Sequence, residues 1–214
     1  MALLHHVAAL LVSVTVCLGT ERAGVPPVAI SSGSRDICKG LECPQFTVLN
    51  TTDKWELRHY PLTKWVATNA TAMNKQEVGR TMFRRLFQYI SGANAANVNI
   101  DMTAPVATKA IPGQGPNCES EFIMHFMLPF TYWQNPILPT NPAVYIVQTP
   151  PMDVYVRHFG GFATDDDYLE NLATLSTDLS TAEIAVEGSF FFMAGYDGPY
   201  TFINRRNEVW IVKQ

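Results

Sequence analysis

The chain has 214 residues, of which 47% are hydrophobic and 16% are charged. This is the balance of a globular protein with a core of ordinary size, and it excludes an intrinsically disordered chain. The formal net charge is −4, and no basic stripe runs along the sequence. Proteins that bind nucleic acids neutralise phosphates with Lys and Arg, so we expect no nucleic-acid partner.

The first residues are typical of a secretory signal. Residues 7–18 (VAALLVSVTVCL) form an apolar run that is too short to span a bilayer and ends in small residues. We therefore predict a signal peptide over residues 1–19, cleaved after Gly19, and a secreted, extracellular protein, with a retained anchor as the alternative. No second apolar stretch reaches membrane length, so no membrane span is expected in the mature chain.

Secretion gives meaning to two further features. Asn50 and Asn69 begin Asn-x-Thr sequons, which accept glycans only in chains that pass through the secretory route. A cleaved signal also removes one of the four cysteines, and three remain: Cys38, Cys43 and Cys118. In an oxidising compartment this number predicts one disulfide and one further thiol, and the spacing does not decide which pair is bridged.

The predicted domain follows an irregular segment. Residues 20–50 are rich in Gly, Ser and Pro and have no sustained period, which predicts a cysteine-containing N-terminal arm. The domain itself is predicted over residues 51–214, and its first strand begins near Lys54. Residues 55–60 (WELRHY) alternate and predict a strand, and residues 65–71 predict a second one. The alternation puts three side chains on one face of the first strand: Trp55, Leu57 and His59.

A helix is predicted after these two strands. Asn74 is a suitable N-cap, and Glu77 lies three residues further on, as in a capping box. From Val78 to Ile90, apolar residues recur at helical spacing, and Gly92 supplies the C-terminal stop. The pattern predicts an amphipathic helix with one face on the core.

Extended segments are predicted at residues 100–110 and 122–128. Residues 129–151 then hold six of the fourteen prolines of the chain. Proline removes a backbone donor and fixes φ, so this density excludes a central strand or a helix. It predicts a long loop with one short edge strand at Val144–Val147.

The pattern then starts again. Residues 155–159 (YVRHF) echo residues 56–60 (ELRHY), and three Asp residues suit the N-terminus of a helix predicted at 168–179. Strands are predicted at 190–194 and 208–212. Strand, helix, strand, strand therefore occurs twice, which predicts an α+β fold built from a duplicated βαββ repeat with pseudo-twofold symmetry. The expected product is an antiparallel sheet or distorted barrel flanked by two helices.

Five short motifs occur in order along the chain: WELRHY at 55–60, WVAT at 65–68, MTAPV at 102–106, AGYDGP at 194–199 and NRRNEVW at 204–210. With these motifs the chain resembles the SOUL haem-binding family over residues 51–214, as a secreted branch of that family. The resemblance implies the duplicated βαββ fold, and it implies binding of haem or a related tetrapyrrole in a shallow apolar groove.

The same resemblance assigns the groove to the first helix and to the loop between the last two strands. It implies six groove residues: Arg80, Phe83, Arg84, Phe87, Tyr200 and Thr201. Aromatic side chains suit a flat macrocycle, and an Arg can pair with a haem propionate. The resemblance also makes His59 a candidate axial ligand of the haem iron, and the alternative is a hydrogen-bonded histidine in or near the core.

The predicted function is that of an extracellular carrier or scavenger of haem that catalyses nothing. Two alternatives stay open at this point. One is a binding module for another apolar small molecule, and the other is an enzyme that modifies a bound tetrapyrrole. No pair of residues with the features of a general acid and base stands out from the sequence, which disfavours the enzyme. The sequence predicts no particular protein partner.

Overall fold

The computed structural model describes residues 37–115 and 118–214, so the predicted signal peptide and the first part of the arm lie outside it. Within these ranges the chain forms two α-helices, α2 (Lys75–Ile90) and α3 (Asp165–Thr181), and one short 3-10 helix, η1 (Phe130–Tyr132). The strands are β1 (Thr47–Thr51), β2 (Glu56–Tyr60), β3 (Thr63–Ala72), β4 (Val106–Ile111), β5 (Ser120–Met127), β6 (Tyr145–Thr149), β7 (Met152–Phe159), β8 (Phe191–Gly195) and β9 (Asn207–Val212).

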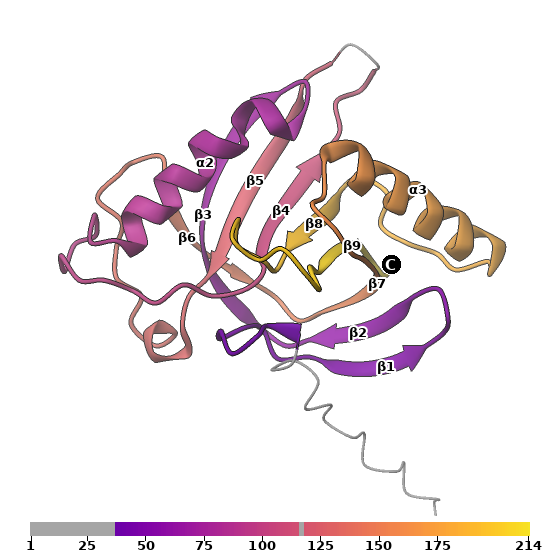
Figure 1. Cartoon of the computed structure of the whole chain (residues 1–214), viewed down its shortest axis with the longest axis horizontal. Helices are drawn as coiled ribbons and strands as arrows, with labels where there is room; N and C mark the ends of the chain where they lie inside the picture. The colour runs from indigo at the N-terminus through magenta and orange to yellow at the C-terminus, as the bar shows by residue number, and fades with distance from the viewer. Residues whose placement is uncertain (1–36, 116–117) are drawn as a thin grey trace, which may run out of the picture.

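All nine strands of the described residues belong to one antiparallel sheet in the order β1-β2-β7-β9-β8-β4-β5-β3-β6 (Figure 1). The sheet is open, with β1 and β6 at its edges, and the α+β class predicted from the sequence is confirmed. The segment β3–α2–β4–β5 and the segment β7–α3–β8–β9 take equivalent places in the sheet and meet where Ala107 of β4 lies opposite Ala194 of β8. This order is the one that the predicted repeat requires, and the duplication itself stays a prediction.

Local signals fix the ends of both helices. The Asn74 side chain accepts a hydrogen bond from the Glu77 backbone N–H, so α2 begins where the capping box predicts. Gly92, with φ of +106°, takes the left-handed conformation that follows many helix ends. The Thr164 side chain caps α3 together with Asp167, and this helix therefore begins at Asp165, three residues before the predicted start.

The two helices cover one face of the sheet (Figure 1). Leu86 of α2 and Leu175 of α3 are fully buried in the core between the helices and the strands. Neighbouring strand residues alternate in direction, so a second core lies on the opposite face, which we call the far face. Its buried residues include Trp65, Ala107 and Trp210. No helix within residues 37–115 and 118–214 is long and apolar enough to cross a membrane.

The folded domain begins earlier in the chain than the predicted residue 51. Cys38 and Cys43 form a disulfide, and both are buried at one end of the far face with Phe46. The Phe46 ring lies 5.3 Å from that of Tyr60. Strand β1 follows and pairs with β2, so this part of the predicted arm belongs to the fold. Cys118 is exposed and is the one cysteine of the described residues outside a disulfide.

The proline-rich segment 129–151 contains η1 and the edge strand β6, which is one residue later at its start than predicted and pairs with β3. Strand β4 begins only at Val106, so the first part of the segment predicted as extended from residue 100 is irregular. Residues 100–105 carry a cis Ala104–Pro105 peptide instead of strand pairing.

Candidate functional site

Four of the predicted groove residues form a stripe along α2. Arg80, Phe83, Arg84 and Phe87 follow one another at steps of three and one residues, which places them on the same helix face. Phe83 is 39% exposed and Phe87 is 49% exposed. Their rings are close to parallel, with centroids 5.8 Å apart and 15° between the planes. The Phe83 ring also packs edge-on against Phe126 of β5, with the ring centroids 5.2 Å apart. The pair therefore contacts the sheet on one side and is open to solvent on the other.

The two arginines of this stripe are exposed and have no partner in the described part of the chain. Neither Arg80 nor Arg84 forms a hydrogen bond, an ion pair or a ring contact there. Arg85, the next residue, differs in this respect because its guanidinium donates to the Thr68 hydroxyl and to the Asn69 carbonyl. The two guanidinium groups beside the phenyl rings are therefore available to an anionic group.

The loop between β8 and β9, residues 196–206, is held in place by its own polar groups. The Arg205 guanidinium donates to the carbonyl oxygens of Asp197, Gly198 and Thr201, over 3.1, 2.7 and 2.7 Å. The Asp197 carboxylate accepts from the backbone N–H of Arg206 at 2.6 Å. These bonds make the loop a defined platform although most of its side chains face solvent.

This loop presents apolar side chains to the solvent. Tyr200 is 87% exposed, as the predicted groove requires, whereas Thr201 is half-buried. Phe202 and Ile203, which the sequence analysis did not single out, are 74% and 77% exposed. The sequence could have indicated their exposure, because Phe202 and Ile203 follow Gly198-Pro199 in a turn, where apolar side chains have no core to pack against. The Phe202 ring also contacts that of Phe162, at 6.2 Å.

The register of the sheet places the helix stripe and the β8–β9 loop near each other. Phe126, under Phe83, is paired with Val106 of β4, and Val106 is paired with Gly195, where the loop begins. Two strand spacings, about 10 Å, thus separate the two elements along the sheet, and Figure 1 shows the loop between α2 and α3. We call this exposed surface the α2 face; it consists of Arg80, Phe83, Arg84, Phe87, Tyr200, Phe202 and Ile203.

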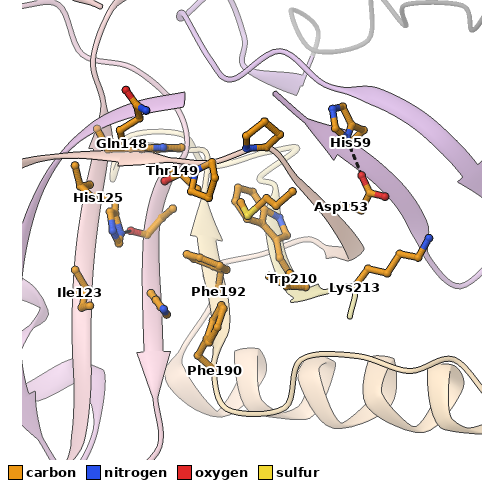
Figure 2. A pocket seen from close by; sticks show the side chains of 18 of the residues that line it. His59, Ile123, His125, Gln148, Thr149, Asp153, Phe190, Phe192, Trp210 and Lys213 are labelled. Atoms are coloured by element: carbon orange, nitrogen blue, oxygen red, sulfur yellow. Dashed lines mark hydrogen bonds and ion pairs between the residues drawn. The ribbon is translucent and has the colours of Figure 1, made fainter. Parts of the chain in front are cut away.

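A large cavity lies elsewhere, on the far face (Figure 2). It has a volume of about 870 Å³, which is within the range of small-molecule sites. Its aromatic walls come from Trp65, Phe190, Phe192 and Trp210. None of the six predicted groove residues lines it, and none lines a smaller hollow of about 170 Å³ between the N-termini of the two helices. The α2 face and the far-face cavity are therefore two separate places.

His59 belongs to the cavity and not to the α2 face. It lies on β2, at the rim of the cavity, and its side chain is 42% exposed. The His59 Nδ1 is 2.7 Å from the Asp153 carboxylate, as Figure 2 shows. Strand β2 lies five places along the sheet from β5, on which α2 packs, and Figure 1 shows it well away from that helix. The structure does not bring the predicted iron ligand to the predicted groove.

His125 also lines the cavity, where the sequence analysis assigned no role to it. Its ring packs against Trp65 and Phe192, with centroids 6.1 and 6.5 Å away. Burial lowers the pKa of His125 to about 4, and the backbone carbonyl of Ala107 only partly offsets this effect. His125 is therefore neutral at physiological pH. In residues 37–115 and 118–214, no cluster of three or more His, Cys, Asp or Glu side chains could hold a metal ion.

Comparison with known proteins shows the family to which this chain belongs. The SOUL heme-binding protein family matches residues 41–212. The chain belongs to this family. It is 31% identical over 193 residues to Heme-binding protein 2 of Mus musculus, which covers 88% of this chain and 93% of that protein. It is 34% identical over 160 residues to Heme-binding protein 2 of Homo sapiens, over 75% of this chain and 78% of that protein.

The fold also occurs in solved structures of much lower sequence similarity. The EcmrR C-terminal domain superposes with a TM-score of 0.56 at 11% identity, over 75% of this chain and 97% of that chain. At such identity the likeness shows the fold alone, because one fold serves many functions.

Proposed function

We propose that the protein binds haem or a related tetrapyrrole on its α2 face and carries it outside the cell without catalysing a reaction. Membership of the SOUL family and relatives named heme-binding proteins support the ligand. One observation carries the location: the exposed, near-parallel Phe83–Phe87 pair lies beside two guanidinium groups that have no partner in the described chain.

The chemistry of the α2 face matches the two parts of a haem. Covering Phe83 and Phe87 with a flat apolar ring removes phenyl surface from water, which is favourable in proportion to the area buried. A propionate carboxylate can accept two parallel hydrogen bonds from one guanidinium, so Arg80 and Arg84 can hold the acidic edge. The apolar side chains of the β8–β9 loop add a second wall.

Titration of the purified protein with hemin, followed at the Soret band, tests the proposal. The wild-type protein is expected to give a saturable shift at micromolar hemin. The double change Phe83→Ala/Phe87→Ala should raise the Kd at least about tenfold, because it removes both stacking rings. Leu169→Ala is the matched control, since Leu169 on α3 is as exposed as Phe87, at 49%. A wild-type protein without a saturable Soret shift contradicts the proposal.

His59→Ala separates the α2 face from the cavity in the same titration. Haem on the α2 face lies out of reach of His59, so this variant should keep the wild-type Soret maximum and Kd. A displaced maximum in His59→Ala, together with unchanged binding in Phe83→Ala/Phe87→Ala, would move the haem to the far-face cavity.

The extracellular location is part of the proposal and rests on the signal-like residues 1–19 and on the two sequons. Asn50 lies exposed on the edge strand β1, and Asn69 lies exposed on β3, where its amide donates to Glu121 at 3.0 Å. Both side chains are accessible to a glycosyltransferase. We expect the chain expressed in animal cells to enter the medium and to lose mass in two steps under graded glycosidase treatment. The variants Asn50→Gln and Asn69→Gln should each remove one step, and a chain retained inside the cell would contradict this part.

A further inference from the structure

The far-face cavity contains a lysine in apolar surroundings. Lys109 lies in the middle of β4, paired with Ile123 of β5 and Phe192 of β8, and all three line the cavity. The Lys109 ammonium lies 3.6 Å from the centre of the Phe190 ring. In the described part of the chain it makes no hydrogen bond and no ion pair with a carboxylate. The Phe190 ring is thus the group in contact with the ammonium there, and the Glu187 carboxylate interacts with it only at longer range.

Two lysines and one aspartate are the Lys, Arg, Asp or Glu side chains of the cavity lining. Lys213 lies at the rim, and its ammonium has no partner in the residues that the structure describes. Asp153 is the acidic residue of the lining, and its carboxylate is engaged with His59. Glu187, on the loop before β8, accepts from the backbone N–H of Ser189 and is not in ion-pair contact with Lys109. Lys109 therefore has no carboxylate in contact with its ammonium, and Glu187 compensates its charge only at longer range.

The walls of the cavity define the rest of the ligand. Trp65, Phe192 and Trp210 come from three different strands and line the cavity, and Figure 2 shows the last two of them. The Phe192 and Trp210 rings are in contact, with centroids 5.8 Å apart. Such walls favour a flat or aromatic body, because that body replaces water on their surface.

We infer that the far-face cavity is a second ligand site, separate from the α2 face, for an amphipathic organic anion with an aromatic body and a carboxylate or sulfonate group. The body lies against Trp65, Phe192 and Trp210, and the acidic group meets the Lys109 ammonium. An apolar cation of the same size is disfavoured, because its charge would lie beside the like charge of Lys109.

A matched pair of fluorescent probes tests this assignment. Anilinonaphthalene sulfonate (ANS) carries a sulfonate, and phenylnaphthylamine has the same aromatic body without it. We expect saturable ANS binding to the wild-type protein, and at least about tenfold weaker binding of phenylnaphthylamine, since a charge-assisted pair is worth about that factor. Lys109→Met should reduce ANS affinity about tenfold and leave phenylnaphthylamine affinity unchanged, whereas Lys109→Arg should keep ANS binding. Equal affinities for the two probes, or an unchanged ANS Kd in Lys109→Met, would overturn the inference.

Variants of the α2 face separate this inference from the haem proposal. Phe83→Ala/Phe87→Ala lies outside the cavity and should bind ANS as the wild type does, even where hemin binding is lost. Ile123→Trp fills part of the cavity and should reduce the affinity for both probes while leaving the hemin titration unchanged. Stoichiometric displacement of ANS by hemin from the wild-type protein would show one common site and would contradict a separate one.

Discussion

Glu208→Gln is expected to lower the free energy of unfolding by about 3–5 kcal/mol, because it removes the counter-ion of a buried charge. Arg58 and Glu208 are both fully buried at one end of the far face and form two parallel hydrogen bonds of 3.1 Å. The Glu208 carboxylate also accepts from Tyr196, Arg206 and Trp210. Urea unfolding followed by circular dichroism measures the loss.

Glu56→Gln is the matched control for this change. Glu56 also contacts the Arg58 guanidinium, at 2.7 Å, but its side chain is 29% exposed. Water screens such a pair, so the expected loss is below about 1 kcal/mol. The double change Arg58→Met/Glu208→Leu should recover part of the stability lost in Glu208→Gln, since it leaves no fully buried charge unpaired: Arg206 and Glu56, which lose these partners, are partly exposed. Equal losses in Glu208→Gln and Glu56→Gln would contradict the central role of the buried pair.

The Arg58–Glu208 pair also makes the free energy of unfolding decrease at low pH. Burial raises the pKa of Glu208, but Arg58, Arg206 and the hydrogen bonds from Tyr196 and Trp210 outweigh this effect, and the pKa lies below its ordinary value of 4.5. A carboxylate with a lowered pKa stabilises the folded state above its unfolded pKa. This contribution is therefore complete above pH 4.5 and is lost as the pH falls through the lower, folded value.

His125 is expected to make the free energy of unfolding decrease at a higher pH than Glu208 does. The unfolded chain takes up a proton on this side chain near pH 6.5, whereas burial lowers the folded pKa to about 4. Between these two values the unfolded state binds more protons, so the free energy of unfolding decreases as the pH falls, by at most about 1.4 kcal/mol per pH unit. Urea unfolding at several pH values from 7 to about 4.5 measures the slope.

His125→Gln should flatten that slope, because glutamine does not titrate. His158→Gln is the comparison: His158 lies exposed on β7, and although partial burial and Arg206 lower its pKa too, its removal should change the slope less. A slope that is the same in His125→Gln and in the wild type would show that His125 takes up its proton as readily in the folded as in the unfolded chain, and would contradict this prediction.

The elements predicted most accurately were those with a signal in neighbouring residues. The start of α2 was predicted to the residue, because the Asn74 side chain caps the Glu77 backbone N–H within one turn, while its amide donates to the Glu77 carboxylate. Alternation located β2, the echo of its sequence located β7, and proline density located the edge strand β6. The family motifs also pointed to the Phe83–Phe87 stripe, whose exposure follows from its place on the outer side of an amphipathic helix.

The errors and omissions concern contacts between distant residues. Glycine and serine content predicted an arm before residue 50, but the Cys38–Cys43 disulfide and Phe46 are buried because the far face of the sheet offers them a partner surface in Tyr60. The sequence also did not show that His59, a candidate iron ligand, lies away from the helix groove. Alternation says which residues share a face of one strand, but it does not say how far apart two strands lie in the finished sheet.

The sequence by itself determined the α+β class, the two helices, most of the strands and the family, because periodicity, capping and short motifs act over a few residues. Only the tertiary structure decided that the α2 face and the far-face cavity are separate, and that the Lys109 ammonium lies against the Phe190 ring with no carboxylate in contact. The cavity is assembled from strands that are distant in the chain, and their order in the sheet follows from the packing of the whole core. No local pattern encodes that order.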